Sequence, residues 1–224
     1  MNIRGSLALA AGALAVMSCI GCRVAGLAGE RITSFRCDVE VHEDGTARAV
    51  ETFNVHSTGD RVQHGIWREF PTDHVDSSGS RRPFEVKVEQ VRQNGEPAEH
   101  FLFAIPGASR VYIGDRDALL PPGDHEYSIR YSTSPIVEEV DGRLFISWEI
   151  TGFGWSLPID KLTATFELPV RRSDAADAEV SMQPGGDAER VTVETRRGRV
   201  EIATQGKLEE GQGLQVRISW PAAE

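Results

Sequence analysis

The chain is poor in cysteine, in aromatic residues and in positive charge. It has three Cys among 224 residues, 7% aromatic residues, and 24 Lys and Arg against 34 Asp and Glu, which gives a formal charge of −10 at pH 7. Binding to a nucleic-acid backbone needs clustered Lys and Arg, so we expect no nucleic-acid partner. The cysteines suggest little chemistry, with a Cys22–Cys37 disulfide as the alternative, and the length suits one globular domain with a short targeting segment.

Motifs that carry a reaction mechanism are also missing. The sequence has neither a G-x-S-x-G turn nor an H-E-x-x-H helix. The pairs His64 with Glu69 and Asp73 with His74, and the hydroxyl of Ser156, are the groups that catalysis would use. Nothing in their spacing places a nucleophile beside a base. We therefore expect no catalytic residues and no cofactor, and a hydrolase is the enzymatic alternative.

Metal-binding patterns are incomplete. Asp115, Asp117 and Asp124 could gather around calcium, but they lack the D-x-[DN]-x-[DN]-G spacing of a calcium loop. Cys19 and Cys22 have the C-x-x-C spacing of zinc and redox sites, but they lie inside an apolar run without a second pair. We expect no metal site.

The N-terminus has the layout of a secretory signal. The eighteen residues Gly5–Cys22 carry no charge and follow a short segment with one positive charge. Val16–Cys19 is similar to a bacterial lipobox, so we expect a signal segment at residues 1–18, lipidation of Cys19 and a tether at residues 19–30. Release by cleavage after Ala28 and an uncleaved membrane anchor are the alternatives. Each places the domain outside the cytoplasm, membrane-anchored or secreted.

From residue 31 to residue 221 apolar residues alternate with polar ones. Phe35, Cys37, Val39 and Val41 are one example, in which Cys37 is a small buried hydrophobe. Similar runs recur between turns rich in Gly, Asp, Asn and Pro, and no window keeps a helical apolar stripe for three turns. The pattern predicts an all-β domain, an antiparallel β-sandwich of about eleven strands.

Two aromatic blocks interrupt the alternation, and they hold the candidate binding residues. Trp67 and Arg68 lie in the first block, Phe153 and Trp155 in the second. We expect the three rings to close one end of the sandwich, since large aromatics contribute most when buried. Their display to a protein or glycan partner is the alternative.

Glu51 occupies an inward position when the strand is counted in steps of two from Ala49 to Phe53. A buried carboxylate needs a partner, and Arg68 is the best candidate because its guanidinium can bind a carboxylate through two hydrogen bonds. A bulge that turns Glu51 to solvent is the alternative.

The two blocks and the turns between them resemble a known family. The matching segments are Glu51-Thr52, Gly65-Ile66-Trp67-Arg68-Glu69-Phe70-Pro71, Gly114-Asp115, Gly123-Asp124-His125-Glu126-Tyr127 and Trp148 through Pro158-Ile159. They look like the extracytoplasmic N-terminal domain of YciQ-like predicted bacterial membrane proteins, a family of unknown function. The resemblance implies a secreted or membrane-tethered β domain, and it supplies no catalytic residues. Such proteins continue into a membrane helix, whereas this sequence has no second apolar stretch before Glu224.

These patterns together predict a non-catalytic cell-envelope domain that binds or organises other envelope components. The membrane, through an N-terminal lipid or anchor, and envelope proteins or glycans are the expected partners. A spacer or sensor ectodomain of a larger membrane protein is the alternative.

Overall fold

The computed structural model describes residues 29–76, 79–152, 154–170, 176–186 and 188–222. No helix in this part of the chain has the length and apolarity needed to cross a membrane. The elements are β1 (Arg31–Val41), β2 (Ala47–Ser57), β3 (Ile66–Pro71), β4 (Asp73–Val75), β5 (Arg81–Pro83), β6 (Val86–Gln93), β7 (Glu96–Pro97), β8 (His100–Ile105), β9 (Ala108–Ile113), β10 (Gly123–Thr133), β11 (Glu138–Val140), β12 (Arg143–Glu149), β13 (Leu162–Glu167), β14 (Asp177–Gln183), η1 (Ala188–Arg190), β15 (Val191–Arg196), β16 (Arg199–Thr204) and β17 (Gly213–Pro221).

The strands form one large sheet and three smaller ones. The large sheet has the order β15-β16-β13-β1-β2-β10-β6-β7, and the smaller sheets are β11-β12-β17-β14, β3-β9-β8 and the hairpin β4-β5. Neighbouring strands are antiparallel except β1 and β13, which run parallel with Phe35 opposite Leu162. The fold is therefore all-β and mostly antiparallel.

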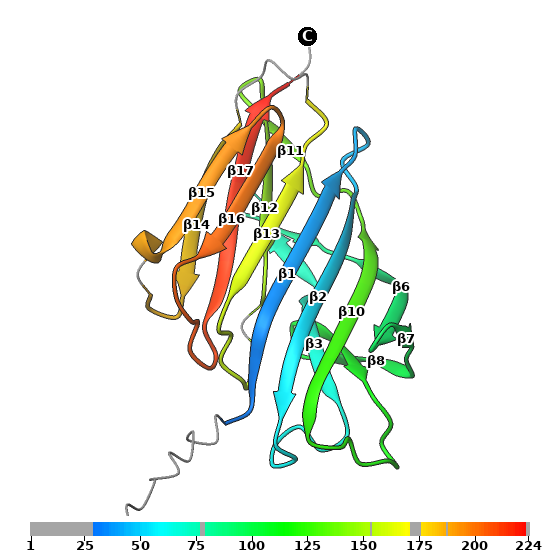
Figure 1. Cartoon of the computed structure of the whole chain (residues 1–224). Helices are drawn as coiled ribbons and strands as arrows, with labels where there is room; N and C mark the ends of the chain where they lie inside the picture. The colour runs from blue at the N-terminus through cyan, green and yellow to red at the C-terminus, as the bar shows by residue number, and fades with distance from the viewer. Residues whose placement is uncertain (1–28, 77–78, 153, 171–175, 187, 223–224) are drawn as a thin grey trace, which may run out of the picture.

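The four-stranded and three-stranded sheets pack against the large sheet, behind it in the view of Figure 1. Ring contacts join the layers: Trp148 of β12 lies 6.2 Å from Phe166 of β13, and Phe70 of β3 lies 4.7 Å from Tyr131 of β10. The large sheet thus offers one face to two different sheets, and the junction between those two sheets lies over its middle strands.

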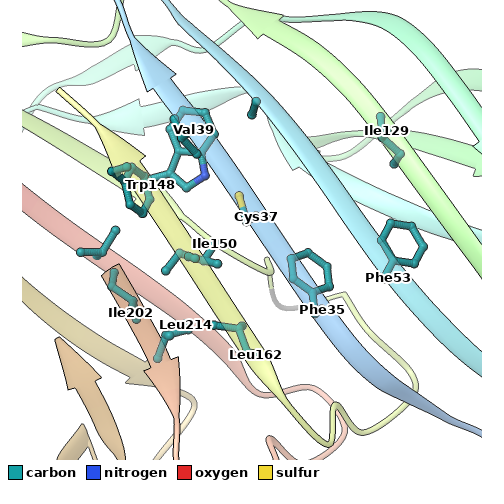
Figure 2. Packing of buried hydrophobic residues seen from close by; sticks show 14 of the residues in the cluster. Phe35, Cys37, Val39, Phe53, Ile129, Trp148, Ile150, Leu162, Ile202 and Leu214 are labelled. Carbon is teal, nitrogen blue, oxygen red and sulfur yellow. The ribbon is translucent and has the colours of Figure 1, made fainter. Parts of the chain in front are cut away.

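The core between the layers follows from the alternation of apolar side chains. Figure 2 shows the buried residues Phe35, Cys37, Val39, Phe53, Ile129, Leu162 and Ile202 of the large sheet with Trp148 and Leu214 of the four-stranded sheet and Ile150, which directly follows β12. Burying a large apolar side chain stabilises a fold by about 1.5–3 kcal/mol. The expected core position of Cys37 is confirmed, and Trp148, which alternates in phase with Leu144 and Ile146, is buried as well.

The structure differs from the expected sandwich in the number and pairing of its strands. The described residues form seventeen strands rather than about eleven, and one pair is parallel. The turn at Asn94-Gly95 joins β6 to the two-residue β7, while β8 belongs to the three-stranded sheet. The alternating residues on either side of this turn, Phe84 to Val88 and Phe101 to Ile105, predict a hairpin between β6 and β8. This prediction is wrong, because β8 pairs with β9 instead.

Candidate functional site

Glu51 and Arg68 form an ion pair in the interior. Glu51 lies on β2 between Ala49 and Phe53 and is 0% exposed, and Arg68 lies on β3 and is 2% exposed. Arg68 Nε donates to Glu51 Oε2 at 2.7 Å and Nη2 donates to Oε1 at 2.8 Å. The sequence predicted this pair from the inward position of Glu51, and the structure brings the two residues together.

Two further groups complete this buried cluster. Tyr131 Oη donates to Glu51 Oε1 at 2.8 Å, and Arg68 Nη2 also donates to the carbonyl of Ile150 at 3.3 Å. Tyr131 lies in the large sheet and Ile150 directly follows β12 of the four-stranded sheet. Arg68 therefore links all three packed sheets through one guanidinium.

The charge of Glu51 favours the ionised form of Arg68. Burial acts to lower the pKa of Arg68, but the Glu51 carboxylate outweighs it, so this pKa lies above its ordinary value. Burial, together with the charge of Glu51, raises the pKa of Tyr131 well above its ordinary value. The tyrosine is thus a neutral donor to the Glu51 carboxyl group, and the charge of Arg68 is met by Glu51 inside the cluster.

The second aromatic block approaches this cluster closely through two glycines. A Cβ placed on Gly152 would lie 2.7 Å from Arg68 Nη1, and one placed on Gly154 would overlap the carboxylate of Glu69. A side chain at either position would require these neighbouring charged groups to shift. Small residues in this block therefore allow the close packing of β3 against the end of β12.

Trp155 closes one end of the core. It is 6% exposed, its ring lies 5.3 Å from Phe53 and 6.0 Å from Phe35, and its Nε1 donates to the carbonyl of Thr151 at 2.8 Å. The expectation that this ring is buried is confirmed. Phe153, the second ring of the block, lies outside the described residues.

Trp67 has a different position from the one expected. It lies on strand β3, half-buried, and its register partners are Tyr112 on β9 and, next to Tyr112, Phe101 on β8. The Arg110 guanidinium lies 5.2 Å from the centre of the Trp67 ring and ion-pairs with Glu69. Trp67 therefore does not close the core, because β3 places it on the face that points away from the large sheet.

The edge strand β8 carries an apolar surface. Phe101, Leu102 and Phe103 are consecutive and are 42%, 52% and 38% exposed. Arg116 lies 4.8 Å from the Phe101 ring. Within the described part of the chain, β8 pairs with β9 along one edge and has no strand on the other. Sequence reasoning missed this surface, although His100-Phe101-Leu102-Phe103-Ala104-Ile105 breaks the alternation and could have indicated it.

A cleft of about 340 Å³ opens where the three-stranded sheet, the hairpin β4-β5 and the four-stranded sheet meet. Its lining includes Arg68, Phe70, Phe84, Tyr131, Trp148 and Glu149. The buried ion pair thus lies directly beneath this cleft. Sequence reasoning did not single out Glu149, because its outward position on a half-exposed strand looks like any solvated carboxylate.

The groups considered for catalysis do not come together in the pairs that were considered. His64 Nδ1 lies 2.9 Å from the carbonyl of Ala118, whereas Glu69 binds Arg110. Asp73 binds Arg81.

The remaining groups considered for catalysis or calcium binding also have other partners. His74 lies 3.5 Å from Glu138, and Ser156 contributes its carbonyl to Arg61. Asp124 lies 2.7 Å from His56.

No group of three or more His, Cys, Asp or Glu residues within the described ranges is arranged to hold a metal. Cys37 is buried and free, and burial raises the pKa of its thiol well above the ordinary value. Cys19 lies outside the described residues.

Comparison with known proteins identifies a family of unknown function. Residues 31–220 match the N-terminal domain of the predicted membrane proteins of family DUF2207. The uncharacterized protein YciQ of Escherichia coli K12 is 26% identical over 133 residues, which cover 59% of this chain and 21% of YciQ. The chain thus spans about a fifth of the length of this relative.

Solved structures of similar fold are distant in sequence. Yeast LTA4 hydrolase has a TM-score of 0.52 in its complex with bestatin, at 12% identity, and 0.52 in its native form, at 11% identity. The similarity covers 84% of this chain and 28% and 29% of those chains. At this identity the similarity concerns the fold alone.

Proposed function

Because the chain belongs to the DUF2207 family of predicted membrane proteins, we propose that it is a non-catalytic, extracytoplasmic domain of the cell envelope. Its β-sandwich is tethered to the membrane through the N-terminal segment, and it binds another envelope protein through strand β8. The uncharged run Gly5–Cys22 and the lipobox-like Val16–Cys19 support the tether.

The observation that carries this proposal is the exposed apolar edge of β8. An edge strand leaves a row of N–H and C=O groups without partners, and soluble proteins usually protect such edges with charge, proline or a covering segment. In β8 both faces are apolar at the centre, with Phe101 and Phe103 on one face and Leu102 on the other. This combination suits an extended segment of a partner, whose backbone pairs with β8 while its apolar side chains cover these rings.

A spacer or sensor ectodomain of a larger membrane protein is the second candidate. It is favoured by the coverage of YciQ, since the chain corresponds to only 21% of that protein. The segment that pairs with β8 would then belong to another domain of the same polypeptide and not to a separate envelope protein.

A hydrolase is the third candidate, and nothing in the site geometry favours it. A panel of esters, peptides and glycosides tests it with the purified chain. Turnover that His64→Ala or Ser156→Ala abolishes would overturn the non-catalytic proposal.

Site-specific crosslinking in cells tests the proposed interface. The full chain carries a photo-crosslinking amino acid at Leu102, and crosslinked products are compared in membranes of the native organism. We expect one discrete product that the double variant Phe101→Thr/Phe103→Thr loses, since threonine keeps the strand propensity and removes the apolar area. The control Val75→Thr changes another exposed apolar residue, outside β8, and should keep the product. The interface is overturned if the product survives in the double variant, or if the chain without these substitutions gives no product in membranes.

Lipidation of Cys19 has its own test. Metabolic labelling with palmitate should mark the wild-type chain, and Cys19→Ala should lose both the label and the membrane association. An unlabelled wild-type chain that begins at Gly29 would indicate release after Ala28, and an unlabelled full-length chain in the membrane would indicate an uncleaved anchor.

A further inference from the structure

The guanidinium groups of the cleft above the buried ion pair are already paired with carboxylates. Each guanidinium in it has a carboxylate partner: Arg68 binds Glu51 at 2.7 Å, and Arg81 binds Asp73 at 2.5 Å. Its positive charge is thus already compensated by the protein. An anionic ligand would have to displace one of these carboxylates.

Glu149 is the carboxylate that remains. It lines the cleft on β12, it is half-buried, and no described residue donates a hydrogen bond to it or forms an ion pair with it. Burial raises the pKa of Glu149 above its ordinary value. The positive charge of Arg68 acts to lower this pKa, and the negative charge of Asp73 acts to raise it. A partly desolvated carboxylate without a partner is costly unless something else supplies the countercharge.

The walls of the cleft restrict what that countercharge can be. Phe84 and Trp148 contribute apolar surface, and Ser147 and Gln215 contribute a hydroxyl and an amide. A metal ion would need several strong ligands, and the described residues contain no group of three or more His, Cys, Asp or Glu side chains that could hold one. An organic cation needs one carboxylate and an apolar surround.

We propose that this cleft binds a small organic cation, an alkyl-substituted ammonium group whose charge is met by Glu149 and whose apolar part lies against Phe84 and Trp148. The volume of about 340 Å³ lies at the lower end of small-molecule sites and limits the ligand to a small one. The inference is independent of the proposed partner on β8, because the two surfaces share no residue.

Ligand-observed NMR titration of the full chain in detergent micelles tests the proposal. The probe is choline, and the control ligand is 3,3-dimethylbutan-1-ol, which has the same shape without the charge. We expect saturable binding of choline and at least about tenfold weaker binding of the neutral analogue. Equal affinities, or no saturable binding of choline, overturn the proposal.

Two variants separate the role of Glu149 from general electrostatics. Glu149→Gln should weaken choline binding about tenfold and leave the neutral analogue unaffected. Glu179→Gln removes an exposed carboxylate from β14 in the same four-stranded sheet and should change neither affinity. Thermal melting of both variants confirms that they fold. Unchanged choline binding in folded Glu149→Gln overturns the assignment.

The pH dependence of choline binding provides a further test, because it would not change with Glu149 if this residue had only a structural role. Choline binding should weaken as the pH falls through the raised pKa of Glu149. Asp73, His74, Arg68 and Arg81 also line the cleft, and their charges act on a bound cation as well. The part of the pH dependence that disappears in Glu149→Gln belongs to Glu149, and a profile identical in both proteins contradicts the proposal.

Discussion

The guanidinium of Arg68 makes two parallel hydrogen bonds to the carboxylate of Glu51, and both side chains are excluded from solvent. Removing two charges from water costs several kcal/mol per ion, which a well-formed pair only partly offsets. The pair is therefore a weak source of stability. Its geometry instead determines how β3 and the end of β12 are placed against β2, since no apolar contact has the same directional requirement.

A double-mutant cycle measures this coupling. Glu51→Leu or Arg68→Met alone leaves the other charge buried without a partner and should cost about 3–5 kcal/mol in the free energy of unfolding. The double variant should cost clearly less than the sum, because it strands no charge. Urea denaturation of all four proteins gives the coupling energy. Losses that add to within about 0.5 kcal/mol would show that the two charges act independently.

Tyr131 and Tyr127 offer a matched comparison on the same strand. Tyr131 Oη donates to Glu51, whereas Tyr127 Oη is buried and has no hydrogen-bond partner among the described residues. We expect Tyr131→Phe to cost about 1.5–3 kcal/mol, the range for a hydrogen bond to a charged group. Tyr127→Phe should be neutral or slightly stabilising, since it removes an unsatisfied hydroxyl. Equal effects in urea denaturation would contradict the role of Tyr131.

Much of the large sheet could be predicted from alternation. Counting in steps of two placed Phe35, Cys37 and Glu51 on the inward face, and the chemistry of a buried carboxylate then led to Arg68. This reasoning works where one face of a strand is buried and the other solvated, as in β1 and β2. It requires no knowledge of which strands are neighbours.

The division into several sheets could not be predicted in the same way. Alternation does not tell which strands pair, so β8 was assigned to the wrong hairpin and the positions of β3 and β9 were missed. Trp67 and Trp155 have similar local sequences rich in Gly, Pro and aromatics, yet one lies on an outer sheet face and the other in the core. The cleft around Glu149 forms only when β12 packs beside β3, and these two strands lie far apart in the sequence.

Gly65 and Gly114 lie against each other next to the paired ends of β3 and β9, and neither position should tolerate a side chain. Both residues have φ of +137°, and a Cβ on Gly65 would overlap the carbonyl oxygen of Ile113. Gly95, with φ of +82°, has open space around it. We expect Gly65→Ala to cost more than about 4 kcal/mol or to prevent folding. Gly95→Ala carries only the left-handed backbone penalty of about 1–2 kcal/mol.

Circular dichroism with thermal melting separates the two glycine variants. Gly95→Ala serves as the control for conformational strain without a clash. If Gly65→Ala melts as high as Gly95→Ala, the two backbone segments can move apart, and close packing at Gly65 is not required.

Glu30 joins the start of the domain to the loop after β2. Its two carboxylate oxygens accept hydrogen bonds from the backbone N–H groups of five consecutive residues, Thr58 through Val62. Burial acts to raise the pKa of Glu30, but these donors, Arg61 first, outweigh it and lower the pKa below the ordinary 4.5. The ionised carboxylate is therefore favoured by the fold.

Glu30→Gln should destabilise the domain by about 1–3 kcal/mol at pH 7, because an amide has one acceptor oxygen and no charge. A carboxylate whose pKa is lowered on folding stabilises above its unfolded value, and this contribution is lost as pH falls through the folded pKa. The difference between wild type and Glu30→Gln should thus be constant at neutral pH and shrink below pH 4.5. Urea denaturation at several pH values measures it, with the exposed Glu96→Gln as control, which should change stability by less than about 0.5 kcal/mol throughout. A difference that persists undiminished into acid would mean that Glu30 acts through its shape and not through its charge.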